Sequence, residues 1–166
     1  HIGDEIADGL LLADADLPHP LSLFDGLRTD FSLARLRHYT GTPPEHVQRY
    51  VLFTNYHRYV DEFVRWACTQ LGTDSGYEML SCPGGVTVTE ATEDPVATVA
   101  DSAWRRHQMP AWHLTAPDKS GITLVNIGVG PSNAKTITDH LAVMRPEAWL
   151  MIGHCGGLRA SQRIGD

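Results

Sequence analysis

The chain has 166 residues, the size of one ordinary domain, and a compact fold of this length buries roughly two-thirds of its unfolded surface. Hydrophobic residues at 42% and charged residues at 20% are ordinary for a globular protein, and no apolar run approaches the roughly 20 residues that span a bilayer, which excludes a membrane role. The formal net charge of -7 argues against a nucleic-acid partner, because that affinity comes largely from Lys and Arg neutralising phosphates.

The cysteines and the first residues indicate the compartment. Cys68, Cys82 and Cys155 are an odd count without a CxxC spacing, which fits neither a disulfide framework nor a zinc ribbon. We therefore expect reduced thiols and no bound metal. The first residues are acidic and lack the basic start and apolar core of a secretory signal. The sequence thus predicts a cytoplasmic protein.

Residues 1–46 are expected to form a lead-in or linker segment. Up to about residue 29 they hold Asp, Gly and Pro without a sustained apolar period. Residues 30–39 form a short stretch that fits either a helix or a strand, and it ends at a turn containing Pro43 and Pro44. The main folded unit is expected over residues 47–166.

Strands and helices are predicted to alternate from residue 50 onward. Residues 50–53 are a short apolar run of β-formers, and apolar residues then recur at helical spacing from 60 to 71. Residues 77–80 and 86–89 are both β-prone and are separated by a Pro-Gly-Gly turn. Pro95 suits the first turn of a helix that is expected to end near Gln108.

The second half of the chain predicts a hairpin followed by a strand–helix–strand unit. Residues 110–115 and 121–127 are predicted as two strands joined by a polar turn. Apolar residues line one helical face over residues 134–144, Pro146 stops that helix, and residues 148–152 are interpreted as a buried strand. We expect an α/β fold with a mainly parallel or mixed sheet, incomplete at its C-terminus, with ligands at the carboxyl ends of its strands.

A glycine loop follows the strand at residues 121–127. Gly128-Val129-Gly130-Pro131-Ser132 lies between that strand and the next helix, where glycines let backbone N–H groups approach a ligand closely. The dinucleotide fingerprint would have a third glycine where this sequence has Asn133. A plain strand-to-helix turn fits this loop equally well when it is taken alone.

Two further segments follow predicted strands. His154-Cys155-Gly156 stands in a glycine-rich stretch after the last strand, where there is room for a flat ligand. Thr54 and Asn55 end the first strand, and Arg58 falls in the first turn of the next helix, which suits a phosphate. The alternative for Arg58 is a solvated helix arginine paired with a carboxylate at position 61 or 62.

These three segments, in this order, resemble the nucleoside phosphorylase/nucleosidase superfamily. Its glycine loop matches residues 128–132, its Ser/Thr-Cys-Gly segment matches residues 154–156, and the arginine of its phosphate loop matches Arg58. The resemblance implies a three-layer αβα fold without a cofactor. It implies phosphate binding by Thr54, Asn55 and Arg58, and nucleoside binding by Gly128, Gly130, Ser132, His154, Cys155 and Gly156.

Two positions depart from the superfamily pattern. Met151 stands where the hexameric phosphorylases have an arginine, and His154 stands where they have Ser or Thr. Both family residues help to hold the attacking phosphate, so the changed pocket argues against phosphorolysis. Within the superfamily, the sequence is most similar to the hydrolases that split AMP into adenine and ribose 5-phosphate. The resemblance makes residues 1–46 part of an interdomain region and residues 47–166 the N-terminal part of a catalytic domain.

The resemblance also implies that the catalytic machinery is incomplete here. The Asp that protonates the departing purine and the Met-Glu pair that binds ribose come later in the family pattern, so the catalytic acid is expected beyond residue 166. The chain alone is expected to be inactive. A sheet that lacks its closing strands has an unpaired edge, and we therefore expect a homo-oligomer.

Several alternatives stay open from the sequence. One is a purine nucleoside phosphorylase, which would use inorganic phosphate, or a nucleosidase that acts on an unphosphorylated nucleoside. A second is a nucleotide-binding module without turnover. A third is an unrelated Rossmann-like domain whose glycine loops are structural turns.

Overall fold

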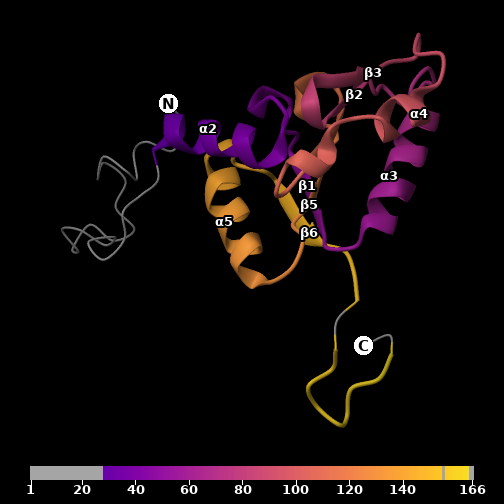
Figure 1. Cartoon of the computed structure of the whole chain (residues 1–166). Helices are drawn as coiled ribbons and strands as arrows, with labels where there is room; N and C mark the ends of the chain where they lie inside the picture. Colours follow the sequence, from indigo (N-terminus) through magenta and orange to yellow (C-terminus); the bar gives the residue numbers. More distant parts are fainter. Residues whose placement is uncertain (1–27, 155, 165–166) are drawn as a thin grey trace.

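The computed structural model describes residues 28–154 and 156–164. Over these residues, six strands form one mixed sheet in the order β3-β2-β4-β5-β1-β6, with helices on both faces (Figure 1). The predicted α/β class with a mixed sheet is confirmed. The strands are β1 (Tyr50–Thr54), β2 (Met79–Cys82), β3 (Val86–Val88), β4 (Ala111–Thr115), β5 (Ile122–Asn126) and β6 (Ala148–Met151).

The sheet has a parallel half and an antiparallel half. β1 lies between β5 and β6 and pairs with both in parallel. β2 pairs antiparallel with β3 and β4, and β4 pairs antiparallel with β5. The hairpin predicted from residues 110–127 is therefore confirmed as β4 and β5. Their turn includes η4 (Pro117–Lys119).

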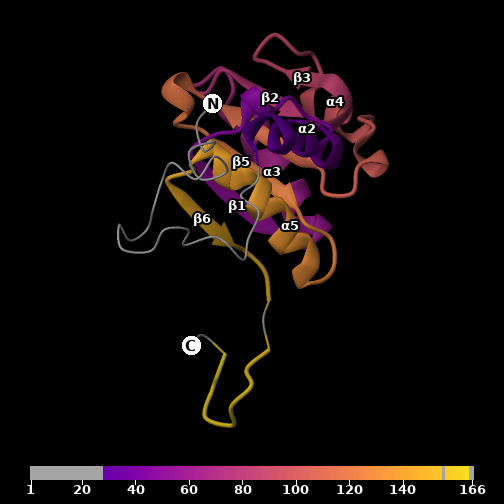
Figure 2. The same cartoon turned by 90° about the vertical axis from the view of Figure 1, so that its left-hand side faces the viewer.

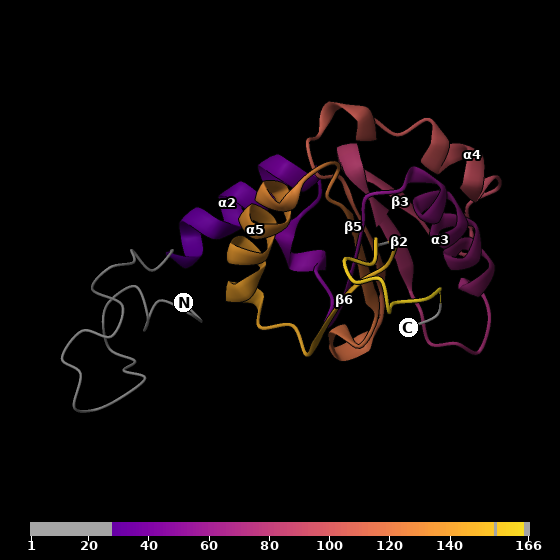
Figure 3. The ribbon, with the colours of Figure 1, turned by 90° about the horizontal axis from the view of Figure 1, so that it is seen from below.

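Helices cover the two faces of the sheet separately. α3 (His57–Gln70) and α4 (Pro95–Ala100) lie on one face, and α2 (Thr29–Thr40) and α5 (Pro131–Leu141) lie on the other (Figure 3). The apolar spacing that predicted α3 is the spacing of its buried residues, Val60, Phe63, Val64 and Ala67. A helix with its apolar residues on one stripe gains most of its stability by burying that stripe.

α2 resolves the uncertain stretch at residues 30–39 as a helix. It ends at Gly41, whose φ of 72° is the left-handed conformation that residues other than glycine disfavour. Leu36 of α2 is buried in one cluster with Ile137 and Leu141 of α5. α2 thus packs on the same core as the strands that follow it, while a domain boundary at residue 46 stays a prediction. Residues 1–27 lie outside the described residues.

The helix predicted to run from Pro95 to Gln108 is wrong in its length. α4 begins at Pro95, where Asp94 accepts a hydrogen bond from the N–H of Ala97, but it ends at Ala100. Trp104 then starts a separate turn, η3 (Trp104–Arg106), and stacks on the imidazole of His57 at 4.2 Å. This tertiary contact overrides the continuous apolar stripe in the sequence.

The strand at residues 148–152 forms as β6, but the expectation that it is buried is wrong. Its side chains are exposed, with Trp149 at 40%, Leu150 at 59% and Met151 at 50%. The cause is position, because β6 is the last strand in the sheet order (Figure 2). An apolar run is buried on both faces only when helices or further strands cover it. The uncovered edge that the sequence led us to expect is therefore present among the described residues.

The remaining short elements connect the strands and helices. None of the helices in the described part of the chain has the length and apolar character that crossing a membrane requires. The connecting turns are η1 (Pro44–His46), η2 (Pro83–Gly85) and η5 (Ala142–Met144).

Candidate functional site

The three predicted site loops begin side by side at one edge of the sheet. β5, β1 and β6 are neighbouring parallel strands, and Thr54 pairs in register with Asn126 (Figure 2). The ladder continues into the loops, because the N–H of Ile127 donates to the carbonyl of Thr54 at 2.8 Å and the N–H of Ile152 donates to that of Phe53 at 2.8 Å. The structure thus brings together segments that are about 100 residues apart in the chain.

The two helices that follow these strands leave toward opposite faces. α3 follows β1 and packs on one face, whereas α5 follows the adjacent β5 and packs on the other (Figure 3). At such a switch point the loops diverge and leave a crevice above the strand ends, which is where α/β proteins bind ligands. The position therefore favours binding at the loops after β1 and β5.

The glycine loop adopts a backbone conformation that residues other than glycine disfavour. Gly128 has a φ of 64° and Gly130 a φ of 93°. Asn126 accepts a hydrogen bond from the N–H of Gly128 at 3.0 Å, and Asn133 donates to the carbonyl of Ile127 at 2.9 Å. Asn133, at the place of the missing third glycine, therefore fixes the loop from within.

The loop leads into the N-terminus of α5. Gly130 is the N-cap and provides no capping side chain, and Pro131 occupies the first helical position. Ser132 is exposed beside it. The first N–H groups of a helix have no partner within the helix and attract anions, so this end of α5 presents donors at the crevice.

The predicted phosphate residues differ in their exposure. Thr54 is fully buried, and its hydroxyl accepts a hydrogen bond from the N–H of Tyr56 at 3.1 Å. Asn55 and Arg58 are exposed. Thr54 therefore shapes the turn after β1, while Asn55 and Arg58 offer their polar groups to the surroundings.

Arg58 is not held by the carboxylates nearest to it in the sequence. Asp61 lies 3.4 Å from the imidazole of His57, and Glu62 pairs with Arg65. Among the described residues, the guanidinium of Arg58 instead lies over two aromatic rings, those of Tyr56 and Tyr59. Neither tyrosine was predicted as a site residue from the sequence. The available signal was that Tyr56 and Tyr59 are three positions apart across the start of α3.

His154 joins this group from the loop after β6. Its ring lies 5.3 Å from the ring of Tyr56 and 6.2 Å from that of Tyr59. His154 and Gly156 are exposed. Cys155, also predicted to bind the nucleoside, lies outside the described residues. The loops after β1 and β6 are therefore in direct contact through aromatic side chains.

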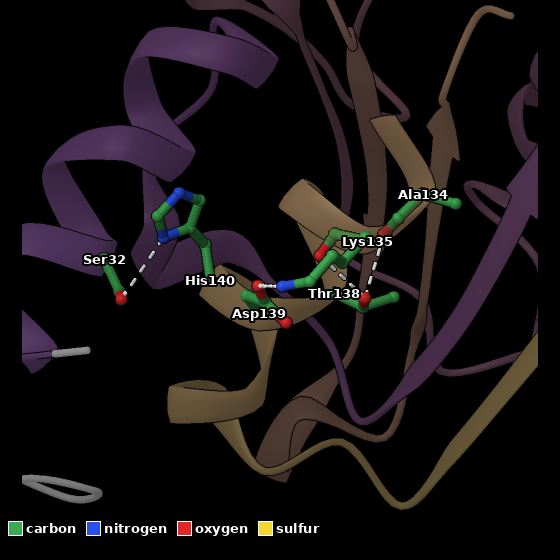
Figure 4. A network of polar contacts seen from close by, with 6 residues as sticks. All are labelled: Ser32, Ala134, Lys135, Thr138, Asp139 and His140. Carbon is green, nitrogen blue, oxygen red and sulfur yellow. Dashed lines mark hydrogen bonds and ion pairs between the residues drawn. The ribbon is translucent and has the colours of Figure 1, made fainter. Parts of the chain in front are cut away.

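α5 is supported from behind by α2. His140 of α5 points toward Ser32 of α2, with 3.3 Å between Nδ1 and Oγ (Figure 4). Burial and the nearby Arg35 lower the pKa of His140, and Asp139 opposes them. On the exposed side of α5, Lys135 pairs with Asp139. This packing holds the helix whose first turn faces the crevice.

A separate hollow of about 220 Å³ lies between α3 and α4. None of the described site residues that the sequence predicted lines this hollow, so it is distinct from the loop crevice. In the two described ranges no group of three or more His, Cys, Asp or Glu side chains could hold a metal ion. The hollow is lined by His57, Val60, Asp61, Val64, Arg65, Val96, Val99, Ala100, Trp104 and Trp112.

The structure is an α/β domain in which the three predicted site loops follow the carboxyl ends of adjacent parallel strands. No family model matches the chain. The chain is 68% identical over 166 residues to AMP nucleosidase from Escherichia coli K12, and equally to that from Escherichia coli O157:H7. Each alignment covers 99% of this chain and 34% of the relative, so the chain spans about a third of the length of these curated relatives.

A solved structure agrees with the sequence comparison. The crystal structure of AMP nucleosidase from Bacteroides thetaiotaomicron matches with a TM-score of 0.53 and 25% identity, over 83% of this chain and 45% of that one. The resemblance predicted from the sequence is therefore confirmed: the chain is similar to part of AMP nucleosidase in both sequence and fold.

Proposed function

We propose that the protein containing this chain is an AMP nucleosidase that hydrolyses the N-glycosidic bond of AMP to adenine and ribose 5-phosphate. The observation that carries the proposal is the 68% identity over 166 residues to proteins of that name. The geometry supports it, because a glycine loop that leads into a helix N-terminus and a turn that leads to an exposed arginine follow the carboxyl ends of adjacent strands.

The phosphate of AMP is assigned to the first loop. Arg58 supplies a guanidinium that can donate two parallel hydrogen bonds to a phosphate, and Asn55 supplies an amide beside it. Thr54 contributes by shaping the turn, because its hydroxyl is engaged with the backbone of Tyr56. Phosphate recognition would separate this enzyme from nucleosidases that act on uncharged nucleosides.

The nucleoside part of AMP is assigned to the other two loops. Gly128 and Gly130 allow the backbone to approach the sugar closely, and Ser132 offers a hydroxyl at the start of α5. Cys155 and Gly156 are proposed to line the base, and His154 precedes them beside Tyr56 and Tyr59. Inorganic phosphate is a further candidate ligand of the same crevice.

Catalysis requires a group that these loops lack. Departure of adenine is helped by a general acid near N7, and the oxocarbenium-like sugar needs stabilisation while water attacks. The segments 55–56, 127–130 and 152–164 contain no Asp or Glu. We therefore propose that the acid lies beyond residue 166 and that this chain alone does not turn over AMP.

Adenine release measured by chromatography tests the proposal. The substrates are AMP without phosphate and, as a paired control, adenosine with phosphate, each with this chain and with the full-length protein. Release from AMP by the full-length protein alone is the expected result. Release from adenosine only in the presence of phosphate would identify a phosphorylase, and AMP binding without release would identify a binding module. Turnover by the short chain would contradict the assignment of the acid beyond residue 166.

We also infer a cytoplasmic homo-oligomer. The support is the edge strand β6, whose exposed Trp149, Leu150 and Met151 leave an apolar surface beside unpaired strand hydrogen bonds. A second copy of the chain is the proposed occupant. Light scattering of the 166-residue chain should give a mass above that of one chain, and the substitution Leu150→Lys should lower that mass. A monomeric mass for the unsubstituted chain would contradict the inference.

A further inference from the structure

We propose that Tyr59 is a positioning residue that holds Arg58 and His154 together as one anion site across two loops. The inference rests on the proposed function, since the anion is taken to be the phosphate of the nucleotide. Arg58 comes from the start of α3 and His154 from the segment after β6, 96 positions later in the chain. Both side chains are exposed, so neither is fixed by burial.

The ring of Tyr59 contacts both groups. The guanidinium carbon of Arg58 lies 5.1 Å from the ring centroid, and the hydroxyl of Tyr59 accepts a hydrogen bond from Arg58 at 3.4 Å. The imidazole of His154 lies 6.2 Å from the same ring at an interplanar angle of 30°. The half-buried ring of Tyr59 therefore positions Arg58 and His154, two hydrogen-bond donors that follow different strands.

Tyr56 forms a second wall of the same cluster. Its ring meets those of Tyr59 and His154 edge-on, at 88° in both pairs. The backbone of Gly153 runs against it, because a Cβ at that position would lie 3.3 Å from Cε2 of Tyr56. A side chain there would require the Tyr56 ring to shift by a few tenths of an ångström, so glycine eases the approach that brings His154 to the tyrosines.

Arg58 keeps its charge available for a ligand. The carboxylates of Asp61 and Glu62 are engaged with His57 and Arg65, and none of the described acidic side chains pairs with Arg58. The face of an aromatic ring attracts a guanidinium without neutralising it. An arginine held in this way loses little further rotamer freedom when a phosphate binds, which lowers the cost of binding.

Leu and Phe substitutions at Tyr59 in the full-length protein distinguish a role of the ring in positioning Arg58 and His154 from a general role in stability. Tyr59→Leu removes the ring and should raise KM for AMP about 5- to 10-fold, with kcat within about twofold of the parent. Tyr59→Phe keeps the ring and should restore a KM close to that of the parent. The inhibition constant of adenosine against AMP should stay unchanged in both variants, because adenosine has no phosphate. Tyr77→Leu is the matched control, because Tyr77 contacts Trp66 and lies outside the cluster.

Direct binding tests the inference independently of turnover. Calorimetry should show that Tyr59→Leu binds ribose 5-phosphate more weakly than the parent protein and Tyr59→Phe do, in the same order as their KM values for AMP. In the parent protein, NMR signals of the Arg58 Nε–H and of the His154 ring should move together in a titration with ribose 5-phosphate, and should give one Kd. Inorganic phosphate is the second titrant. If it binds as tightly as ribose 5-phosphate, the site is one for free phosphate and not for the phosphate of a nucleotide.

The outcomes separate the two proposals. Absence of adenine release by the parent protein would overturn the proposed function, while the titrations would still decide the role of Tyr59. Equal losses in Tyr59→Leu and Tyr59→Phe, equal weakening of AMP and adenosine binding, or separate Kd values for Arg58 and His154 would each overturn the positioning role. The NMR titration needs no variant, so the proposal stays testable if Tyr59→Leu does not fold.

Discussion

The two halves of the sheet differ in how well their side chains are covered. In the antiparallel half, β4-β2-β3, the core side chains are closed off from solvent, and Leu80, Val88, Trp112 and Leu114 are each 1% exposed or less. The parallel half carries the three loops and ends at β6, where Trp149, Leu150 and Met151 are exposed. The side proposed to bind the ligand is therefore the part that the described residues cover least.

Polar groups follow the same division. In the buried region, His113 is held between the hydroxyls of Thr42 at 2.7 Å and Thr123 at 2.9 Å. At the crevice, Arg58 and His154 are exposed and contact aromatic rings. Buried polar groups need their partners within the fold, whereas exposed ones are available to a ligand. Four predictions follow from this contrast.

The largest effect is expected from truncating a tryptophan in each half. Trp112→Ala leaves a large cavity among fully buried side chains and should lower the free energy of unfolding by about 3–5 kcal/mol. Trp149→Ala should cost less, about 1–2 kcal/mol, because its side chain is 40% exposed and packs on Phe53 from one side. Urea unfolding of the 166-residue chain measures both. Similar losses would contradict the division into a closed half and an open half.

Acid should destabilise the closed half through His113. Burial, with a smaller contribution from His46, lowers the pKa of His113 from 6.5 to about 3. Because the pKa is lower in the folded state, the unfolded chain binds the proton first. Stability is therefore constant above about pH 6.5 and falls as the pH drops toward 3, by an amount of the order of a few kcal/mol. His113→Gln should flatten this dependence in urea titrations at several pH values, and an unchanged slope would contradict it.

At the open half, Arg58→Met should weaken recognition of the phosphate without unfolding the protein. Loss of a charge-assisted contact costs about 1.5–3 kcal/mol, which corresponds to roughly a 10- to 100-fold higher KM for AMP. Arg65→Met is the matched control on the same helix, since Arg65 pairs with Glu62. Kinetics of the full-length protein with AMP, and inhibition of that reaction by adenosine, check the result. An equal effect of the two substitutions would exclude a specific role for Arg58.

The smallest effect is expected at the glycine loop. Gly130→Ala places a side chain at a φ of 93° and should destabilise the loop by about 1–2 kcal/mol. The site should be affected more than the fold, so KM for AMP should rise while the thermal midpoint changes little. Gly76→Ala is the matched control, because Gly76 has a φ of 80°, a Cβ there meets no described atom within 4 Å, and it lies outside the three loops. A wild-type KM in Gly130→Ala would show that the strained turn is dispensable.

Sequence periodicity predicted the elements that depend on local pattern. β1, α3 and the β4–β5 hairpin formed where the apolar spacing placed them, because each element buries the stripe or face that its own residues define. The positions of the three loops at strand ends followed from the same reasoning. Their neighbouring arrangement depends on the order β5-β1-β6, which long-range pairing sets.

Other features depend on contacts that a local pattern does not contain. α4 ends early because Trp104 stacks on His57, and β6 is exposed because it is an edge strand. Thr54 was predicted as a ligand from the family resemblance, whereas its burial and its hydrogen bond to Tyr56 appear only in the fold. Tyr56 and Tyr59 were missed because their partner, His154, lies far away in the sequence.

We propose that the three loops serve the hydrolysis of AMP. The most direct measurement is the reaction of the full-length protein with AMP in ¹⁸O-labelled water, without inorganic phosphate and with mass analysis of the sugar product. We expect adenine together with ribose 5-phosphate that carries one ¹⁸O atom, because water attacks the sugar carbon. Dependence on added phosphate, with a sugar product that carries a second phosphoryl group and no label, would contradict it.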